Sequence, residues 1–566
     1  MTHVNNESSG RQRPIRFGIM CNGTTFSAWE AQCLDKLMKL DNVEPGLLII
    51  DDDRASSSNK WSKLKKITKI WSLYSFLYVN RRSSASKSVD IADILSHVPA
   101  IFCKVVKKGK FSQYFKESDI SEIMKHDLDF ILRFGFNIIR GGILRAARYG
   151  VWSFHHDDEA NYRGAPPCFW EIYRDDNVTG AMLQRLTDRL DGGVVLKKGF
   201  FKTIKTSYVH NLDEVFFRST DWPAQVCIDI RNGKEDYLDA EPSKTSAPIY
   251  YAPNNLQMIL FFLKVIKYFF RRLYNFIFYY EQWNIGIIDN PISDFIRQET
   301  GLQVHWLLAP TKNMFYADPF AVRRENVMTI LFEAYSYRYS KGCIFMINIT
   351  GDTAPHPQIV IDTPFHMSYP YLLEYENEIY CIPEIAQSNE VVLYKAQEFP
   401  KRWIKAAILI RDFAAIDSTV FFHDNLWWLM ASDKETNEYD NLFIWYAHDL
   451  IGPWKPHPAN PVKVDIRSAR PAGTPFISEG NLYRPSQDNS DYYGKRIVIN
   501  RVVKLTPYEF KEEQVKVVEP FKNSLYPDGL HTISAAGNKT LIDGKKRAFI
   551  GANLTVLKYK IKEMML

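Results

Sequence analysis

Short apolar runs alternate with segments of helical periodicity in the first half of the chain. The run that starts at residue 15, "IRFGIMCNG", predicts a buried strand, and the next segment, "FSAWEAQCLDKLMKL", spaces its apolar residues as a helix does, behind the capping residue Ser27. "GLLIIDDD" predicts the following strand, and this order favours a parallel sheet with a right-handed crossover. Two more buried strands are predicted at 128–136 and 149–156. The second leads into "SFHHDDEANYRG" at the carboxyl end of the sheet, where open α/β folds bind ligands.

The second half of the chain contains a repeat. Each copy begins with Pro or Thr in an apolar run, turns at Asn, Glu or Gly, returns through apolar or aromatic residues and ends on an acid; a fifth copy, at 530–544, is degenerate. The steps between successive markers are 51, 49, 56 and 57 residues, the markers being Pro319, Pro370, Thr419, Pro475 and Thr532. Units of this length, each led by a hairpin, predict an all-β propeller of five blades.

The segment 256–280 between the two halves is strongly apolar but carries Lys264, Lys267, Arg271 and Arg272. Its uncharged runs are too short to span a bilayer, so it predicts an amphipathic helix with a basic stripe. Two interpretations stay open: the helix packs between domains, or it lies in an anionic membrane surface. The predicted domains are a disordered tail at 1–14, an α/β domain at 15–250, this linker at 251–282 and the propeller at 283–566.

Composition changes this picture little. A chain of 566 residues is too long for one core, and 46% hydrophobic with 24% charged residues is ordinary for a globular protein. A net charge of +6 without a basic block argues against a nucleic-acid partner. The seven cysteines form no C-x-x-C, so neither a disulfide framework nor a zinc site is expected. The polar start lacks the apolar core of a secretory signal, and we expect a cytoplasmic location, peripheral at the inner face of the membrane if 256–280 lies on it.

Two adjacent histidines carry the candidate chemistry of the first half. Side chains at successive strand positions point to opposite faces, so His155 and His156 cannot share one metal ion, and we expect no metal site. A nucleophile elbow, G-x-S-x-G, is absent. His155 is then a polariser or an acid–base group, which needs a carboxylate to set its tautomer. Asp191, before a Gly-Gly turn, can supply one.

The spacing of these residues resembles a known family. S-F-H stands at 153–155, Gly164 follows His155 by nine residues within an Arg-Gly pair, and "TG" at 179–180 precedes "DGGVVL", whose aspartate is 36 residues after the histidine. Over residues 15–245 the chain resembles the formyltransferase superfamily of methionyl-tRNA, glycinamide ribonucleotide and sugar-amine formyltransferases. The resemblance implies a Rossmann-like α/β fold, 10-formyltetrahydrofolate as the formyl donor and an amine as the acceptor.

The resemblance also implies roles for residues. His155 would donate to the oxyanion that forms on attack, and Asp191 would orient His155 and help to move the amine proton. Ser153 stands where the family has Asn, so it is a candidate catalytic residue with an altered hydrogen bond. The candidate substrate- or cofactor-binding residues are His156 and Asn161, either of which would compensate for the missing Asn, and Arg163 and Gly164, which turn the loop. The acidic loop "HDDEAN" suits a charged amine better than a tRNA backbone.

The second half carries resemblances of its own. "YADPF" and "GPWKPHPANPV" resemble the five-bladed arabinanase- and levansucrase-like glycoside hydrolases. "SYPYLLEYENEIYCIPE" and "RPSQDNSDYYG" resemble, over about 283–560, the propeller that precedes the catalytic domain of plant glucosamine inositolphosphorylceramide transferases. Acids that close each hairpin are expected at one face: Asp318, Glu333, Glu384, Asp417, Asp433 and Asp488. Asp318 matches the base position of the hydrolases, and either Asp417 or Glu384 would serve as the acid. Glycan binding and glycoside hydrolysis both stay open.

Together these patterns predict an enzyme that formylates an amino sugar, nucleotide- or lipid-linked, during surface-polysaccharide or glycolipid biosynthesis. The alternative is a glycan-binding or glycan-hydrolysing propeller whose first domain is degenerate, which the Ser at 153 favours. The sequence leaves the acceptor sugar and the oligomeric state open.

Overall fold

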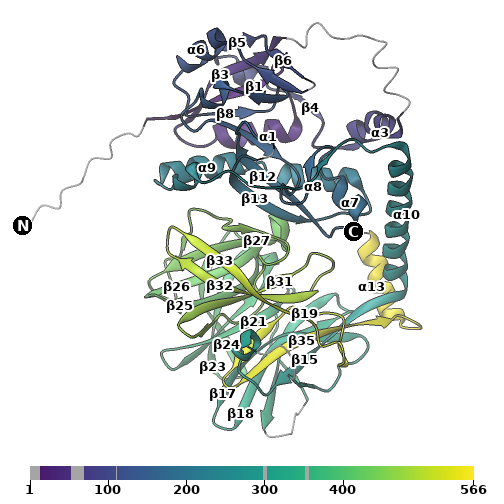
Figure 1. The fold of residues 1–566 in the computed structure, drawn as a ribbon. Coiled ribbons are helices and arrows are strands. Elements are labelled where there is room, and N and C mark those ends of the chain that lie inside the picture. The colour runs from purple at the N-terminus through teal and green to yellow at the C-terminus, as the bar shows by residue number, and fades with distance from the viewer. Residues whose placement is uncertain are drawn as a thin grey trace, which may run out of the picture. The chain divides into compact units, whose positions relative to one another are not determined.

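A computed structural model describes residues 13–52, 69–109, 111–190, 192–297, 302–350 and 356–565. The chain divides into two compact units (Figure 1). The first comprises Met1–Gly199 and Thr203–Val265, and the second comprises Phe200–Lys202 and Ile266–Leu566. The predicted disordered tail lies outside the described residues except for its last two positions, and so does Asp191.

The first unit is built on a seven-stranded sheet in the order β13-β12-β10-β8-β1-β3-β5. Its strands are β1 (Ile15–Cys21), β3 (Val43–Asp51), β5 (Ala100–Cys103), β8 (Phe130–Arg133), β10 (Val151–His155), β12 (Val178–Arg185) and β13 (Val194–Lys202). β1 pairs in parallel with both β3 and β8, β8 pairs in parallel with β10, and β10 pairs antiparallel with β12. The chain therefore starts in the middle of the sheet, runs to one edge and returns to the other side. That order places a topological switch point at the carboxyl ends of β1 and β8.

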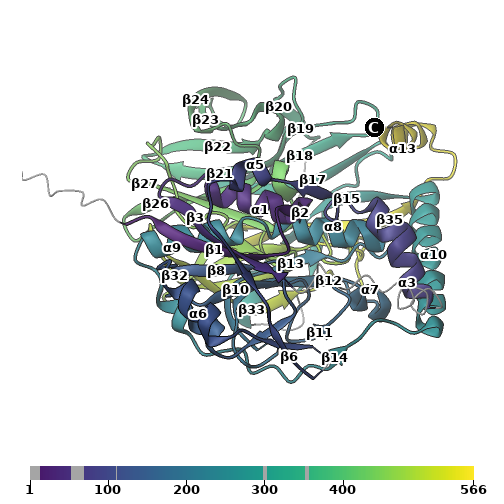
Figure 2. The same cartoon turned by 90° about the horizontal axis from the view of Figure 1, so that it is seen from above.

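Helices cover this sheet (Figure 2). α1 (Ala28–Met38) begins after Ser27, whose backbone N–H and hydroxyl both donate to the Glu30 carboxylate, as a helix start requires. α6 (Glu117–Met124) adds Ile120 and Ile123 to a core cluster that holds Met20 of β1. The other helices are α3 (Ile70–Tyr74), η2 (Ser75–Val79), α4 (Asn80–Arg82), α5 (Ala92–Leu95), η3 (Gly142–Arg145), α7 (Trp170–Arg174), α8 (Tyr208–Arg218), α9 (Trp222–Arg231) and η4 (Asp236–Asp239). The short strands are β2 (Thr25–Ser27), β4 (Ser88–Asp90), β6 (Val106–Lys108), β7 (Ser112–Tyr114), β9 (Ile138–Arg140), β11 (Arg163–Gly164) and β14 (Ile249–Tyr250).

Within the described residues, the second unit consists of five antiparallel sheets of about four strands each. The strands of four sheets follow one another in sequence: β17 (Met314–Arg324), β18 (Val327–Ser336), β19 (Lys341–Thr350), β20 (Gln358–Ile361); β21 (Ser368–Tyr375), β22 (Glu378–Glu384), β23 (Glu390–Glu398), β24 (Arg402–Arg411); β25 (Ala415–His423), β26 (Leu426–Asp433), β27 (Asn441–Ala447), β28 (Lys455–Pro456), β29 (Lys463–Val464); β30 (Phe476–Ser478), β31 (Asn481–Asp488), β32 (Arg496–Leu505), β33 (Phe510–Val518). The five predicted hairpins are each found as the first antiparallel pair of a sheet or, for the degenerate copy, as β34–β35.

The remaining sheet joins strands from the two sequence ends of the unit. β15 (Tyr279–Ile288) and β16 (Val304–Trp306) pair with each other, and β15 also pairs with β35 (Lys539–Phe549), which pairs with β34 (Ile533–Ala536). Phe320, Tyr371 and Val420, from the first strands of three different sheets, share one core cluster. The first strands therefore meet around a common centre, and the arrangement resembles a five-bladed β-propeller.

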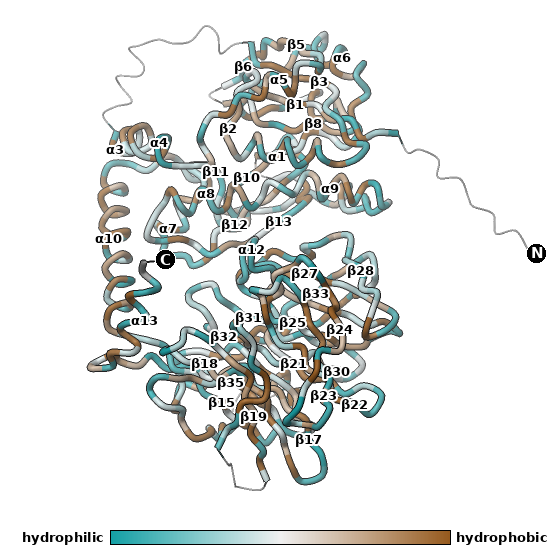
Figure 3. The backbone as a smooth tube through the Cα atoms, turned by 180° about the vertical axis from the view of Figure 1, so that it is seen from behind, coloured by the Kyte–Doolittle hydropathy of each residue, from teal (hydrophilic) through white to brown (hydrophobic). Residues whose placement is uncertain are grey.

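The helix predicted over 256–280 is α10 (Asn255–Phe278). Hydrophobic residues recur along it, as the brown turns in Figure 3 show. Over the ranges that the structure describes, no helix is both long and apolar enough to cross a membrane. The short helices of the second unit are α11 (Asp294–Arg297), η5 (Ala386–Ser388), α12 (Lys434–Asn437) and α13 (Leu554–Met565).

Candidate functional site

His155 is the last residue of β10, at the carboxyl end of the parallel part of the sheet. Its side chain is buried, and Nε2 lies 3.2 Å from the carbonyl oxygen of Tyr162. A carbonyl oxygen only accepts, so Nε2 carries the hydrogen of this contact. The loop that follows β10 thus fixes both the orientation and the donor nitrogen of the histidine.

Ser153 lies two residues before His155, on the same face of β10. It is 1% exposed, and its hydroxyl accepts hydrogen bonds from Arg133 at the end of β8, from Nη2 at 2.8 Å and Nε at 3.2 Å. Arg133 is held further by the carbonyl of Asn137 at 3.1 Å. A guanidinium therefore covers the serine at the switch-point edge of the sheet. The sequence reasoning missed Arg133; the available signal was a charged residue inside the predicted buried strand at 128–136.

His156 has different surroundings from its neighbour. Its ring stacks on Phe216 at 3.8 Å between centroids and meets Trp29 edge-on at 5.0 Å. Nε2 lies 3.2 Å from the hydroxyl of Ser219. Burial, and next the charge of His155, lowers the pKa of His156 to about 3, so this ring is neutral at physiological pH. The structure places His156 among aromatic side chains and does not bring it together with His155.

The other predicted binding residues of the first unit shape the loop. Asn161 donates from Nδ2 to Asp158 at 2.7 Å. Arg163 donates to the carbonyl of Leu190 at 2.7 Å and to that of Ala247 at 3.3 Å. Gly164 has φ +99°, and a Cβ there would lie 2.2 Å from the carbonyl oxygen of Tyr250. Only glycine fits that position, as expected for a turn.

The loop acids already have partners within the first unit. The Nζ of Lys198 lies 2.6 Å from Asp158 and 2.7 Å from the buried Glu159. Glu171 is fully buried beside Asp157, and burial raises its pKa to about 8. The acids of this loop are therefore paired with Lys198 or lie beside the protonated Glu171 of α7, which weakens the inference that the loop was shaped to receive a charged amine.

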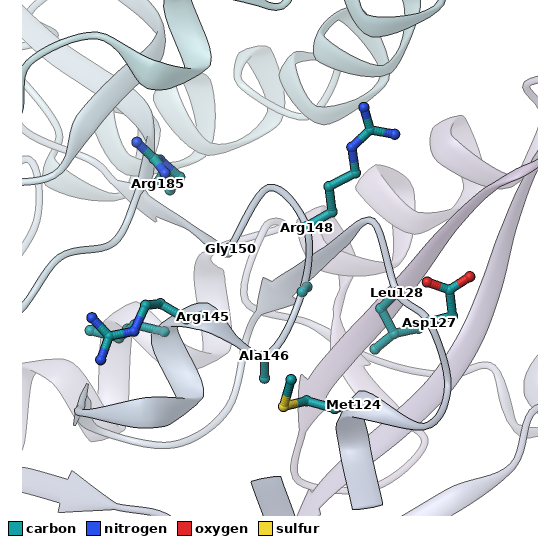
Figure 4. A pocket seen from close by; sticks show the side chains of 10 residues that line it. Met124, Asp127, Leu128, Arg145, Ala146, Arg148, Gly150 and Arg185 are labelled. Carbon is teal, nitrogen blue, oxygen red and sulfur yellow. The ribbon is translucent and has the colours of Figure 1, made fainter. Parts of the chain in front are cut away.

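A hollow of about 410 Å³ lies at the opposite end of the strands, where Gly150 precedes β10 (Figure 4). Arg145, Arg148 and Arg185 line it, and Figure 4 shows their side chains pointing in different directions. Arg148 and Arg185 also face Glu235 and Asp239, at 3.7 and 3.6 Å. Because the guanidinium groups do not converge, this hollow is not a built anion site.

A left-handed residue recurs in the second unit. Asp318, Tyr369 and Asp417 have φ between 43° and 54° and sit at register shifts in β17, β21 and β25, and Gly473 before β30 has φ +118°. The backbone N–H of Tyr369 donates to Asp318 at 3.3 Å, and its hydroxyl accepts from the N–H of Gly473 at 2.7 Å. The repeated bulge thus brings the first residues of different sheets together.

A buried ionic triad lies at this centre. The ring nitrogens of His531 lie 3.2 Å from Asp318 and 2.8 Å from Asp543. Burial alone would lower the pKa of His531, but the carboxylates of Asp543 and Asp318 outweigh it and raise the pKa to about 10. The hydroxyl of Thr532 donates to Asp318 at 2.6 Å. The ligand atoms of the three side chains are close enough to hold one metal ion, but a protonated imidazole between two carboxylates satisfies the same charges.

A second buried group adjoins the triad. Asp417 accepts from Arg470 Nε at 2.6 Å and from Gln487 at 2.8 Å, and its backbone N–H donates to Glu384 at 3.2 Å. Burial, and then the charge of Asp417, raises the pKa of Glu384 to about 8. Burial, and then the charge of Asp318, raises the pKa of Glu333 well above its usual value. The centre therefore combines un-ionised carboxyls with ionised Asp318, the two states that glycoside chemistry combines.

Four of the six predicted propeller acids meet in this way: Asp318, Glu333, Glu384 and Asp417. The other two do not join them. Asp433 accepts from the backbone N–H of Glu435 at 3.1 Å and caps α12, and Asp488 binds Arg496 at 2.7 Å. His531, Asp543 and Arg470 were missed, because their proximity depends on the closure of the sheets around the centre.

Residues 307–529 match the family model of the N-terminal domain of glucosamine inositolphosphorylceramide transferase 1. The relative of that name from Oryza sativa subsp. japonica is 38% identical over 210 residues, which is 36% of this chain and 28% of the relative. The Arabidopsis thaliana relative is 33% identical over 208 residues, 36% of this chain and 27% of its own length. The chain thus spans less than a third of these relatives. Residues 307–529 are therefore similar to the N-terminal domain of these transferases.

The matches of the first unit are more distant. A methionyl-tRNA formyltransferase of Prochlorococcus marinus is 30% identical over 117 residues, 20% of this chain and 33% of that protein.

Among solved structures, the catalytic domain of the Coprinopsis cinerea GH62 alpha-L-arabinofuranosidase aligns with a TM-score of 0.33 and 10% identity, over 39% of this chain and 78% of that one. Parts of the chain are thus similar to two kinds of transferase.

Proposed function

We propose that the chain transfers the formyl group of 10-formyltetrahydrofolate to the amine of an amino sugar during surface-polysaccharide or glycolipid biosynthesis. The observation that carries the proposal is the position of His155. It ends a parallel strand beside the switch point, with a donor nitrogen fixed by the loop that resembles the formyltransferase motif. The family match over 307–529 supports a glycan-linked acceptor.

Four residues of the first unit have a role in this proposal: His155, Arg133, Ser153 and Asp191. When bound, 10-formyltetrahydrofolate supplies the formyl carbon that the amine attacks. In this structure His155 Nε2 donates a hydrogen bond to the Tyr162 carbonyl. In the reaction it donates that hydrogen bond to the formyl oxygen, on which negative charge builds. Arg133 supplies a second, cationic donor in place of the family's Asn, and Ser153 acts as its positioning residue. Asp191 accepts the proton that the amine loses as the new C–N bond forms. When the oxyanion collapses, the bond between the formyl carbon and the folate N10 breaks, and tetrahydrofolate leaves with a proton on that nitrogen.

In the proposal the second unit, considered by itself, binds a glycan. Carboxylates and Arg470 at its centre are groups that bind sugar hydroxyls. We place the reaction in the cytoplasm, at the inner face of the membrane, with no nucleic-acid partner.

The test uses the purified chain with 10-formyltetrahydrofolate and a panel of amino-sugar nucleotides and lipid-linked amino sugars. We expect release of tetrahydrofolate together with one acceptor that gains the mass of a formyl group. Folate release without a formylated sugar would show hydrolysis only. If the chain shows no turnover and also does not bind the folate, the proposal is contradicted.

A second function is favoured by one observation: ionised Asp318 lies in a buried cluster with the un-ionised Glu333. In that alternative the second unit binds or hydrolyses a glycan and the first unit is a degenerate scaffold. Incubation with arabino-, galacto- and xylo-oligosaccharides, followed by chromatography of the products, distinguishes hydrolysis from binding alone. Cleavage without folate binding would favour this alternative.

A further inference from the structure

Helix α10 presents a continuous apolar stripe to solvent. The stripe follows alternate spacings of three and four residues, which keep it on one face of a helix. It comprises Leu256, Ile259, Leu263, Ile266, Phe270 and Leu273, all exposed, with Leu256 at 66% and Phe270 at 61%. Met258 and Phe261, which are buried, face away from it. An exposed apolar surface of this length is unusual for a protein that meets only water.

A second exposed apolar element lies beside the first turns of α10. Tyr74, where α3 meets η2, packs edge-on against Phe262 at 5.3 Å, and the backbone N–H of Ile70 donates to Asn255 at 2.9 Å. In η2, Phe76 is 67% exposed, and Tyr78 is exposed as well. Tyrosine side chains such as that of Tyr78 are enriched where a membrane meets water. Figure 1 shows α3 next to one end of α10.

The charges around the stripe have one sign. Between 255 and 278 the chain has four basic residues and no Asp or Glu. Lys264 is drawn inward to Asp175 at 2.9 Å, whereas Lys267 and Arg271 are exposed along one edge of the stripe. Arg81 and Arg82 follow η2 and are exposed too. Two copies of such a helix would repel each other, so the charges favour an anionic partner.

We infer that α10, together with η2, docks the protein on an anionic lipid bilayer. The helix lies in the headgroup region with its apolar stripe toward the acyl chains, and Lys267 and Arg271 contact acidic lipids. α10 lies in the interface and does not span the bilayer, in keeping with its interrupted hydropathy. Membrane docking does not depend on formyl transfer. Of the two interpretations of 256–280, packing between domains and contact with an anionic membrane surface, it selects the second.

The experiment is flotation of the full chain with vesicles of phosphatidylcholine, with and without phosphatidylglycerol. The wild-type chain should float with the phosphatidylglycerol vesicles. Leu263→Asp/Phe270→Asp should weaken partitioning by at least about tenfold, because two large apolar side chains lose their burial. Phe422→Asp, an exposed residue of β25, is the matched control and should leave flotation unchanged.

A second variant, which removes charge and leaves the apolar stripe intact, tests membrane binding even if Leu263→Asp/Phe270→Asp does not fold. Lys267→Gln/Arg271→Gln should lower partitioning to phosphatidylglycerol vesicles by roughly 30-fold, since each basic residue near an anionic surface contributes a factor of about five. Circular dichroism checks that each variant is folded, and if the stripe variant is not, the charge variant decides. A wild-type chain that stays in solution with both vesicles overturns the inference. So does a lipid-free dimer that the stripe substitutions dissociate, which would make the partner a second copy.

Discussion

His155 and His156 are adjacent in the sequence but differ in their contacts and in their expected roles. The first is fixed by a backbone carbonyl at the end of a strand, and the second is stacked among aromatic rings with a lowered pKa. If His155 donates to the formyl oxygen, His155→Ala should reduce kcat for formyl transfer by about 10²- to 10³-fold, the usual effect of losing one oxyanion donor. Single-turnover assays measure this step. His156→Ala should instead lower the melting temperature, because it leaves a cavity beside Phe216.

Arg133 gives a second prediction at this scale. Arg133→Met should reduce kcat by about 10²-fold or more if the guanidinium is an oxyanion donor. Ser153→Ala should reduce kcat less, because it removes only the group that holds the arginine in place. Arg148→Met is the matched control, since that arginine lines the hollow at the far end of the strands. An unchanged kcat in Arg133→Met would remove the arginine from the mechanism.

Glu384 makes stability depend on pH in a defined direction. Burial, with the charge of Asp417, raises its pKa from 4.5 to about 8. Between these values the unfolded chain has released a proton that the folded chain still holds, so the contribution of Glu384 to stability falls as the pH rises and becomes constant above about 8. Glu384→Gln should abolish this slope. Urea unfolding of both chains across the window measures the difference, and parallel pH profiles would contradict it.

At the scale of elements, the left-handed position before β30 leaves no room for a side chain. A Cβ at Gly473 would lie 1.7 Å from the carbonyl oxygen of Ile533, with φ at +118°. Gly473→Ala should therefore destabilise the second unit by about 3 kcal/mol, because the adjoining strand must move. Gly480→Ala is the control: it also has positive φ, but no atom lies within 4 Å, so about 1 kcal/mol is expected. Denaturant unfolding compares the two.

The elements themselves were predictable to different degrees. Hydrophobic periodicity found α1, α10 and β10 close to their observed bounds, because their apolar residues recur with the period of a helix or a strand, whereas β8 covers only four residues of the predicted strand at 128–136. The hairpin repeat located the first strands of the five sheets for the same reason. Contacts across the fold were not predictable: Thr532 reaches Asp318 across 214 residues, and Arg133 reaches Ser153 from a neighbouring strand. The acids of the His155 loop were misleading, since Lys198 neutralises two of them from β13.

The whole second unit should respond to alkaline pH through His531. Its pKa is raised from 6.5 to about 10 by the two carboxylates, so the stabilisation is fully present below 6.5 and is lost as the pH rises through 10. We expect the melting temperature of the wild-type chain to fall across that window. His531→Gln should start lower, because Asp318 and Asp543 lose their partner, and should change less with pH. Differential scanning calorimetry tests both, and a flat wild-type profile would show that the triad is not ionic.

The closing sheet of the second unit has a consequence for biosynthesis. β15 pairs along its length with β35, and the side chain of Thr540 bonds the carbonyl of Asn290 across 250 residues. A ribosome that has just completed β15 must therefore add four further sheets before this strand meets its partner. Until then the edge of β15 that will pair with β35 stays open to other chains, and we expect the nascent protein to be most prone to aggregation in this interval.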